Sequence, residues 1–183
     1  MASILICNPT APAPAATATG PGPGPELAGA RVAVVNNGWM SMTLIAKKLA
    51  ERLPADYGVA SVRVHVVEPN GGATEEVLAS IARDADLAVV GLANCGGCTS
   101  WSVQNQVELL RRGVHSVLLV TERYKKLADA IYAGRGMVDA PSVVLPITEA
   151  TEYGAEDVMD EIAETALRGA AALLASGSAV RVA

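Results

Sequence analysis

Five short valine-rich segments alternate with longer segments whose apolar residues recur at helical spacing, and this alternation restricts the fold more than any other feature of the chain. The strands are expected at residues 32–36, 62–67, 87–92, 116–120 and 142–145. The helices are expected at residues 42–53, 74–83, 100–112, 122–132 and 155–174. Strands that are apolar along their whole length are typical of a parallel sheet covered by helices on both faces.

We therefore predict an α/β fold with a flavodoxin-like or Rossmann-like, doubly wound sheet of about five parallel strands in the order 2-1-3-4-5. The composition agrees with this fold, because 51% of the residues are hydrophobic and only 3% are aromatic, which leaves a core of Val, Leu, Ile and Ala. The 183 residues suit one domain. We place that domain at residues 31–176, after a Pro-, Gly- and Ala-rich arm and linker at 1–30 and before a short tail at 177–183.

Charge and hydropathy argue against several classes of protein. The net charge of −5 disfavours a nucleic acid as the main partner, and no apolar run reaches the roughly 18–20 residues of a membrane-spanning helix. Three cysteines do not make the disulfide framework of a small secreted protein, and the N-terminus lacks the basic segment of a signal peptide. We expect a cytoplasmic protein without nucleic-acid or membrane partners.

The N-terminal arm predicts self-association. Residues 1–25 carry no charged side chain, and Ile4, Leu5 and Ile6 precede a stiff linker that is rich in Pro and Gly. This apolar segment has no evident core partner within its own domain. We expect a homodimer or larger homo-oligomer in which the arm or an apolar helix face is buried.

Two of the three cysteines stand where the third expected strand gives way to a helix. Cys95 and Cys98 bracket Gly96 and Gly97. The positive end of the helix dipole favours a thiolate over a thiol, and the glycines allow backbone amides to turn toward a bound group. We predict that Cys95 is a catalytic nucleophile and that Cys98 is the resolving thiol or proton donor, with both at least partly accessible.

Burial as inert core residues and zinc binding are the alternatives for this pair. An inert structural role suits a lone cysteine better than two cysteines that flank a Gly-Gly turn. A Cys-x-x-Cys motif supplies half of a zinc site, but Cys7, His65 and His115 lie far apart in the sequence and show no ligand spacing. We expect no metal and no cofactor.

In a doubly wound sheet, ligands bind beyond the carboxyl ends of the strands, where the loops after the first and third strands face each other. The first of these loops reads Asn-Asn-Gly-Trp, and the second holds the cysteines. The predicted substrate-binding residues, including one at the start of the fourth helix, are Asn36, Asn37, Gly38, Trp39, Asn94, Gly96, Gly97, Thr99, Ser100 and Glu122. We expect a small-molecule substrate, with a carboxylate at the helix amides as one option.

Several of these residues also have a structural interpretation. Thr99 and Ser100 are of the type that caps helices, and residues 36–38 are of the type that forms a turn at the end of a strand. Glu122 suits the first turn of a helix, where a carboxylate meets the helix dipole. The sequence leaves these alternatives open.

The string from Cys95 to Ser102, Cys-Gly-Gly-Cys-Thr-Ser-Trp-Ser, resembles the signature of the UGSC family of selenoproteins and their cysteine homologues. The resemblance runs from about residue 31 to residue 174. It implies that Cys95 takes the position of the selenocysteine and Cys98 that of the partner cysteine. The family is distantly similar to the selenocysteine-bearing subunits of glycine, sarcosine, betaine and proline reductases, which implies reductive or thiol-transfer chemistry on small organic acids.

The chain departs from the family pattern at three places. Gly97 replaces the family's serine, residues 39–41 read Trp-Met-Ser where Lys-Pro-Asn is usual, and residues 147–148 read Ile-Thr where His-Pro is usual. Two polar or basic groups are therefore lost from the expected crevice, and an apolar wall replaces one of them. These departures indicate a specialised relative with a substrate of its own.

We conclude from the sequence that the chain is a thiol-dependent enzyme of the reductase or thiol-transfer type, an oxidoreductase that acts on a small organic molecule. An external thiol is the expected reductant. A non-redox isomerase, lyase or transferase that uses a covalent cysteine is one alternative. A ligand-binding or redox-sensing module without turnover is another.

Overall fold

The computed structural model of the protein describes residues 24–68, 71–138, 140–146, 156–176 and 181–182. One sheet contains the strands β1 Arg31–Asn36, β2 Ser61–Val66, β3 Leu87–Ala93, β4 His115–Thr121 and β6 Ser142–Leu145. The helices are α1 Met40–Tyr57, α2 Glu75–Asp84, α3 Gly96–Arg111, α4 Glu122–Gly134 and α5 Glu156–Ala175.

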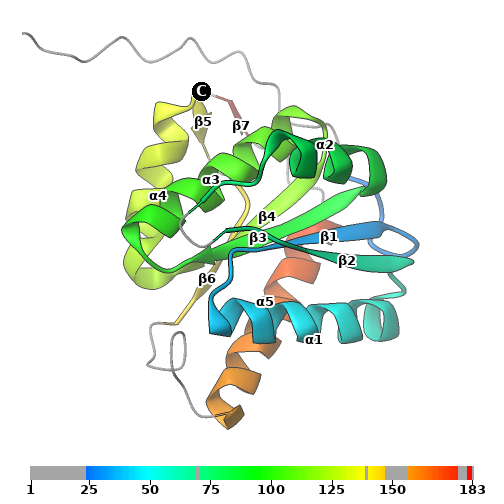
Figure 1. The fold of residues 1–183 in the computed structure, drawn as a ribbon. Helices are drawn as coiled ribbons and strands as arrows, with labels where there is room; N and C mark the ends of the chain where they lie inside the picture. The colour runs from blue at the N-terminus through cyan, green and yellow to red at the C-terminus, as the bar shows by residue number, and fades with distance from the viewer. Residues whose placement is uncertain (1–23, 69–70, 139, 147–155, 177–180, 183) are drawn as a thin grey trace, which may run out of the picture.

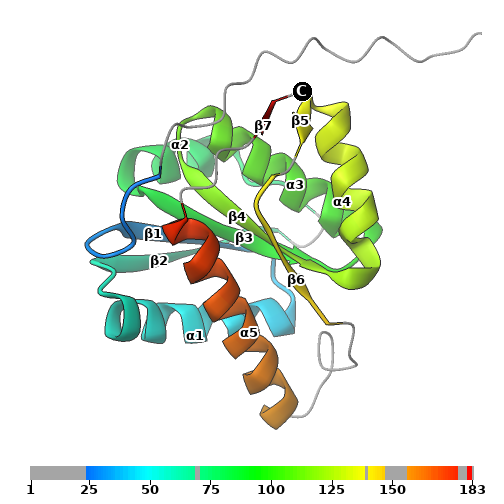
Figure 2. The same ribbon diagram turned by 180° about the vertical axis from the view of Figure 1, so that it is seen from behind.

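All neighbouring strands of the sheet are parallel, in the order β2-β1-β3-β4-β6. This order confirms the predicted 2-1-3-4-5 arrangement of a doubly wound α/β fold. Helices α1 and α5 cover one face of the sheet, and α2, α3 and α4 cover the other (Figures 1 and 2). The central strand β3 is buried along all seven residues, as its uninterrupted apolar sequence predicts.

Each face of the sheet carries its own aliphatic core. Alternate residues of one strand enter different cores: Val32 and Val34 of β1 pack toward α1 and α5, whereas Ala33 and Val35 pack toward α2, α3 and α4. Strand β2, at the free edge, is the least covered, with Val66 71% exposed.

One pairing lies outside the predicted pattern. The short strands β5 Met137–Val138 and β7 Arg181–Val182 pair antiparallel in a separate two-stranded sheet. The segment 177–183 was expected to be only a tail, and two-residue strands are too short to show a period in the sequence. Residues 1–23 of the predicted arm and linker, which include its apolar segment, lie outside the described residues.

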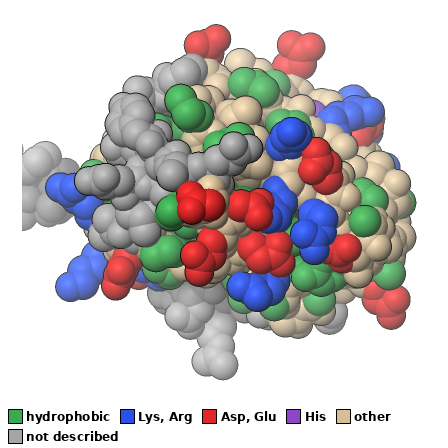
Figure 3. Space-filling model, turned by 90° about the horizontal axis from the view of Figure 1, so that it is seen from below, with side chains coloured by type: hydrophobic (Ala, Val, Ile, Leu, Met, Phe, Trp, Pro, Cys, Tyr) green, Lys and Arg blue, Asp and Glu red, His purple; other side chains and the backbone are tan. Residues whose placement is uncertain are grey.

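The surface of α1 and α5 is charged. Lys48 lies 2.5 Å from a carboxylate oxygen of Asp160 and 3.5 Å from one of Glu164, which also lies 3.5 Å from Arg52. Figure 3 shows acidic and basic side chains interleaved over this face. Within the described part of the chain, no helix is both long and apolar enough to cross a membrane.

Candidate active site

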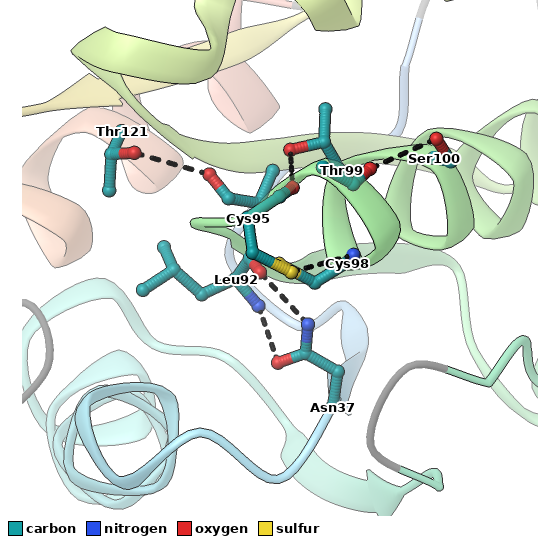
Figure 4. Close-up of a disulfide and its surroundings, with 9 residues drawn as sticks. Asn37, Leu92, Cys95, Cys98, Thr99, Ser100 and Thr121 are labelled. Atoms are coloured by element: carbon teal, nitrogen blue, oxygen red, sulfur yellow. Dashed lines mark hydrogen bonds between the residues drawn. A yellow bond between two sulfur atoms is a disulfide. The ribbon is translucent and has the colours of Figure 1, made fainter.

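The cysteine pair lies where β3 passes into α3. Helix α3 begins at Gly96, four residues earlier than predicted, and Cys95 is its N-cap residue with an extended backbone. The sulfur of Cys95 accepts a hydrogen bond from the backbone N–H of Cys98, with 3.0 Å between Sγ and N. A disulfide joins the two cysteines, whose Cα atoms are 5.2 Å apart (Figure 4).

The expectation that Thr99 or Ser100 caps this helix is wrong, because Cys95 occupies the cap. Both hydroxyls donate backward within the helix, from Thr99 Oγ1 to the carbonyl of Cys95 at 2.5 Å and from Ser100 Oγ to the carbonyl of Gly96 at 3.0 Å. Thr99 is fully buried. The two bonds tie the first turn of the helix to the cysteine that precedes it.

The two cysteines differ in exposure. Cys98 is only 1% exposed, whereas Cys95 is half-buried, so the expectation that both are accessible is wrong for Cys98. Gly96 and Gly97 between them are exposed. A reagent from solvent is therefore expected to reach Cys95 before Cys98.

Asn37 joins the β1–α1 loop to the cysteine loop. Its side-chain amide donates to the carbonyl of Leu92 at 2.9 Å and accepts from the N–H of Leu92 at 2.8 Å, and its backbone N–H donates to the carbonyl of Gly91 at 3.1 Å (Figure 4). Asn37 is buried. The predicted convergence of the two loops on one sheet edge is therefore present, and the side chain of Asn37 acts there as a brace.

The other residues of the β1–α1 loop form a turn. The side-chain oxygen of Asn36 accepts from the N–H of Gly38 at 2.9 Å, and its amide donates to Thr43 Oγ1 at 3.2 Å. Gly38 has a φ of 82°, a conformation that favours glycine. Trp39 precedes α1 without a side-chain cap and packs against the core. This geometry matches the structural interpretation of the segment.

The structure adds two positioning residues that the sequence did not single out. Thr121, at the end of β4, is buried and donates to the carbonyl of Ala93 at 3.4 Å (Figure 4). Gln106 of α3 is fully buried and donates to the carbonyls of Ser116 and Pro141 at 2.8 and 3.0 Å. Nothing in the sequence distinguished Gln106, because the buried face of α3 also holds other polar residues such as Ser102 and Asn105.

Two further predicted binding residues, Asn94 and Glu122, lie beside the cysteine pair. Asn94, which directly precedes Cys95, is buried, and Glu122 is exposed in the first turn of α4. Because β4 neighbours β3 in the sheet, the start of α4 lies at the same edge as the cysteines.

Both histidines lie away from the cysteine loop. His115 begins β4, at the opposite edge of the sheet, and burial lowers its pKa below the ordinary value. His65 lies on the edge strand β2, where burial and then the charge of Arg63 lower its pKa. Among the residues that the structure describes, no cluster of three or more His, Cys, Asp or Glu side chains could hold a metal ion.

A cleft of about 640 Å³ runs along α3 on the side of α2. Of the predicted binding residues in the described part of the chain, Ser100 alone lines it. The lining residues are Gly72, Ala73, Glu75, Leu78, Ser100, Trp101, Gln104, Asn105, Glu108, Arg112 and Arg135.

Comparison with known proteins gives one match. The model of the UGSC family matches residues 5–176, a longer part of the chain than the cysteine motif and its flanking strands. The match begins inside the segment that we predicted to be an arm. No curated protein and no solved structure matches the chain.

Proposed function

The chain belongs to the UGSC family, and we propose that it is a thiol-dependent oxidoreductase that reduces a small organic molecule, with Cys95 as nucleophile and Cys98 as resolving thiol. The observation that carries the proposal is the unequal exposure of two cysteines whose sulfurs lie within bonding distance. An accessible sulfur can attack a substrate, and a buried neighbour can then displace the product.

The environment of Cys95 suits a thiolate. Its sulfur lies at the N-terminus of α3 and accepts a backbone N–H, so both the helix dipole and a hydrogen bond stabilise a negative charge there. This support needs no histidine, which fits the position of both histidines away from this loop.

The reaction is the reductive cleavage of a bond R–X, where X is a heteroatom. The Cys95 thiolate attacks R and expels X, which takes up one proton. The Cys98 thiolate then attacks the Cys95 sulfur and forms the disulfide, while the bonding electron pair leaves with R, which takes up the second proton. The substrate R–X and two thiols thus give R–H, H–X and one disulfide, and two external thiols restore the pair and become a disulfide themselves.

This reaction determines which reductant, compartment and substrate we propose. The pair itself carries the two electrons, so the proposal includes an external thiol and no bound cofactor or metal. A compartment that keeps small thiols reduced is needed for turnover, and we propose the cytoplasm. The substrate is a small organic molecule with a reducible bond, and we propose no nucleic acid or membrane partner.

We also propose that the protein forms a homodimer or a larger homo-oligomer. The free edge of β2 exposes Val64 by 38% and Val66 by 71%, which is typical of a strand that another chain covers. The face of α1 and α5 is crossed by ion pairs and is less suited. Light scattering should report an oligomer, and a monomer that is unchanged by deletion of residues 1–25 would contradict this proposal.

The test uses hydroxyethyl disulfide as a model substrate and dithiothreitol as the external thiol. The wild-type protein and the control Cys7→Ser should catalyse the reduction with multiple turnovers. Cys95→Ser should abolish it, because a hydroxyl is a far weaker nucleophile than a thiolate. When hydroxyethyl disulfide is added to prereduced protein without dithiothreitol, Cys98→Ser should stop at a mixed disulfide on Cys95, which mass mapping would locate.

Two results would replace the proposal by an alternative. Conversion of an organic substrate that is not a disulfide, catalysed by Cys98→Ser without any reductant, would favour covalent catalysis without a redox step. Reversible oxidation of the pair without any turnover, accompanied by a change in shape or partner, would favour a redox sensor.

A further inference from the structure

The cleft along α3 has the size of a ligand site. Its volume of about 640 Å³ falls within the range of roughly 300–1,000 Å³ that is usual for small-molecule sites. Its walls come from α2, from the loop before α2, from α3, and from Arg135 just after α4. The cleft is therefore assembled from segments far apart in the sequence.

One wall of the cleft is an aromatic ring held in place by backbone. A Cβ atom added to Gly72 would lie 2.7 Å from Cε3 of Trp101, so only glycine permits this close approach. The backbone N–H of Ala73 donates to Asn105 Oδ1 at 2.9 Å and fixes the same loop on α3. Trp101 nevertheless remains 44% exposed, which leaves part of the indole free to contact a flat apolar group.

Two charged side chains in the walls of the cleft, Arg112 and Glu108, are bonded to other side chains. Arg112 binds Glu75 through two hydrogen bonds of 2.9 and 2.7 Å, and Glu108 accepts from Gln104 at 3.2 Å and from Arg111 at 3.1 Å. Among the residues that the structure describes, no carboxylate pairs with Arg135, which is exposed. An exposed guanidinium of this kind favours an anionic ligand.

The cleft begins beside the cysteine pair. Gly97 and Trp101 are four residues apart on α3 and therefore share one face of the helix. Trp101 follows Cys98 by three residues, a rise of about 4.5 Å along the helix axis. From Trp101 the cleft continues to Arg112, about 16 Å further along the helix. A ligand in this cleft has one end near the exposed glycines between the cysteines.

We propose that this cleft binds an aromatic anion such as an aryl carboxylate, with its anionic group at Arg135 and its rings directed along the cleft toward Trp101. That such a ligand is the body of the substrate rests on the function proposed above. The binding itself does not, because it requires neither thiol.

The test uses the ¹⁵N-labelled Cys95→Ser protein, which cannot react, and 2-naphthoate as the probe. Titration should shift the indole N–H signal of Trp101 saturably, and the Trp39→Phe variant assigns that signal. The uncharged analogue 2-naphthamide should bind at least about fivefold more weakly, because it lacks the charge-assisted bond to arginine.

Matched variants locate the contacts. Arg135→Gln should weaken the binding of 2-naphthoate by about the same factor and remove the preference over 2-naphthamide. Arg168→Gln, which neutralises an exposed arginine of α5 on the opposite face, should change neither affinity. Trp101→Leu should weaken both ligands.

Three results would overturn the proposal: no saturable shift, equal affinity for the two probes, or an Arg168→Gln effect as large as that of Arg135→Gln. Because none of these measurements involves turnover, they can fail while the thiol chemistry holds. Loss of disulfide reduction with intact binding would conversely contradict only the proposed function.

Discussion

The β1–α1 and β3–α3 junctions are neighbouring strand-to-helix turns at one edge of the sheet. They differ in whether their polar side chains are bonded within the protein or cap a helix. At the first, the side chains of Asn36 and Asn37 are bonded to protein groups, and Trp39 gives α1 no side-chain cap. At the second, the cap is the sulfur of Cys95, a half-buried residue. One junction braces the edge, and the other presents the reactive atom.

This difference suggests that the β1–α1 loop holds the backbone in place and that the β3–α3 loop carries the reactive cysteines. Chemistry at the N-terminus of α3 needs a fixed backbone, because the Cys98 N–H must remain near the Cys95 sulfur. That backbone is held from β1 by Asn37, from β4 by Thr121 and from within α3 by Thr99. The buried side chains of Asn37, Thr99 and Thr121 therefore position the cysteines instead of facing solvent.

The largest effect on stability is expected at the brace. Asn37→Ala leaves both the N–H and the carbonyl of the buried Leu92 without their partner, which should lower the free energy of unfolding by about 2–4 kcal/mol. Urea unfolding measures the change.

Asn36→Ala is the control for that measurement. Its partners Gly38 and Thr43 are exposed, so water can replace the lost bonds and the cost should be smaller. If Asn36→Ala costs as much as Asn37→Ala, the distinction between a brace across the two loops and a local turn is wrong.

A smaller effect should separate the two hydroxyls of α3. Thr99→Val removes a buried donor while keeping the shape of the side chain, which leaves the Cys95 carbonyl short of a bond and should cost about 1 kcal/mol. Ser100→Ala removes a bond of the same kind at an exposed position and should cost a few tenths of a kcal/mol at most. Thermal unfolding of both variants measures the two costs. A larger loss of stability in Ser100→Ala than in Thr99→Val would contradict the prediction.

The smallest effect lies at the opposite edge of the sheet. Burial holds the pKa of His115 below its value in the unfolded chain, so the unfolded state binds more protons as the pH falls through about 6.5. Stability should therefore be highest above this pH and decrease below it. His115→Gln should reduce the slope of unfolding free energy between pH 7.5 and 5.5. An unchanged slope would show that His115 does not contribute.

The sequence predicted the sheet better than the start of α3. Apolar strands of a parallel sheet can be recognised one by one, and connections of fixed handedness then limit the possible strand orders. The start of α3 was missed because two glycines weaken the helical signal and cysteine is an unusual cap.

Contacts between residues far apart in the chain could not be predicted from the sequence either. Asn37 and Leu92 lie 55 residues apart, so nothing local indicates that the amide of one braces the backbone of the other. The cleft likewise depends on the approach of Gly72 to Trp101. In both cases the fold of the sheet brings the residues together in space. No sequence motif links them.

The most direct test of the central claim compares the two sulfurs in otherwise identical proteins. Cys7→Ser/Cys98→Ser retains Cys95, and Cys7→Ser/Cys95→Ser retains Cys98. At pH 7, 5,5′-dithiobis(2-nitrobenzoate) should react with Cys95 at least about tenfold faster, because this sulfur is more exposed and lies at the helix N-terminus. In urea the two rates should become equal. Equal rates in the folded proteins, or faster reaction of Cys98, would contradict the assignment of Cys95 as the nucleophile.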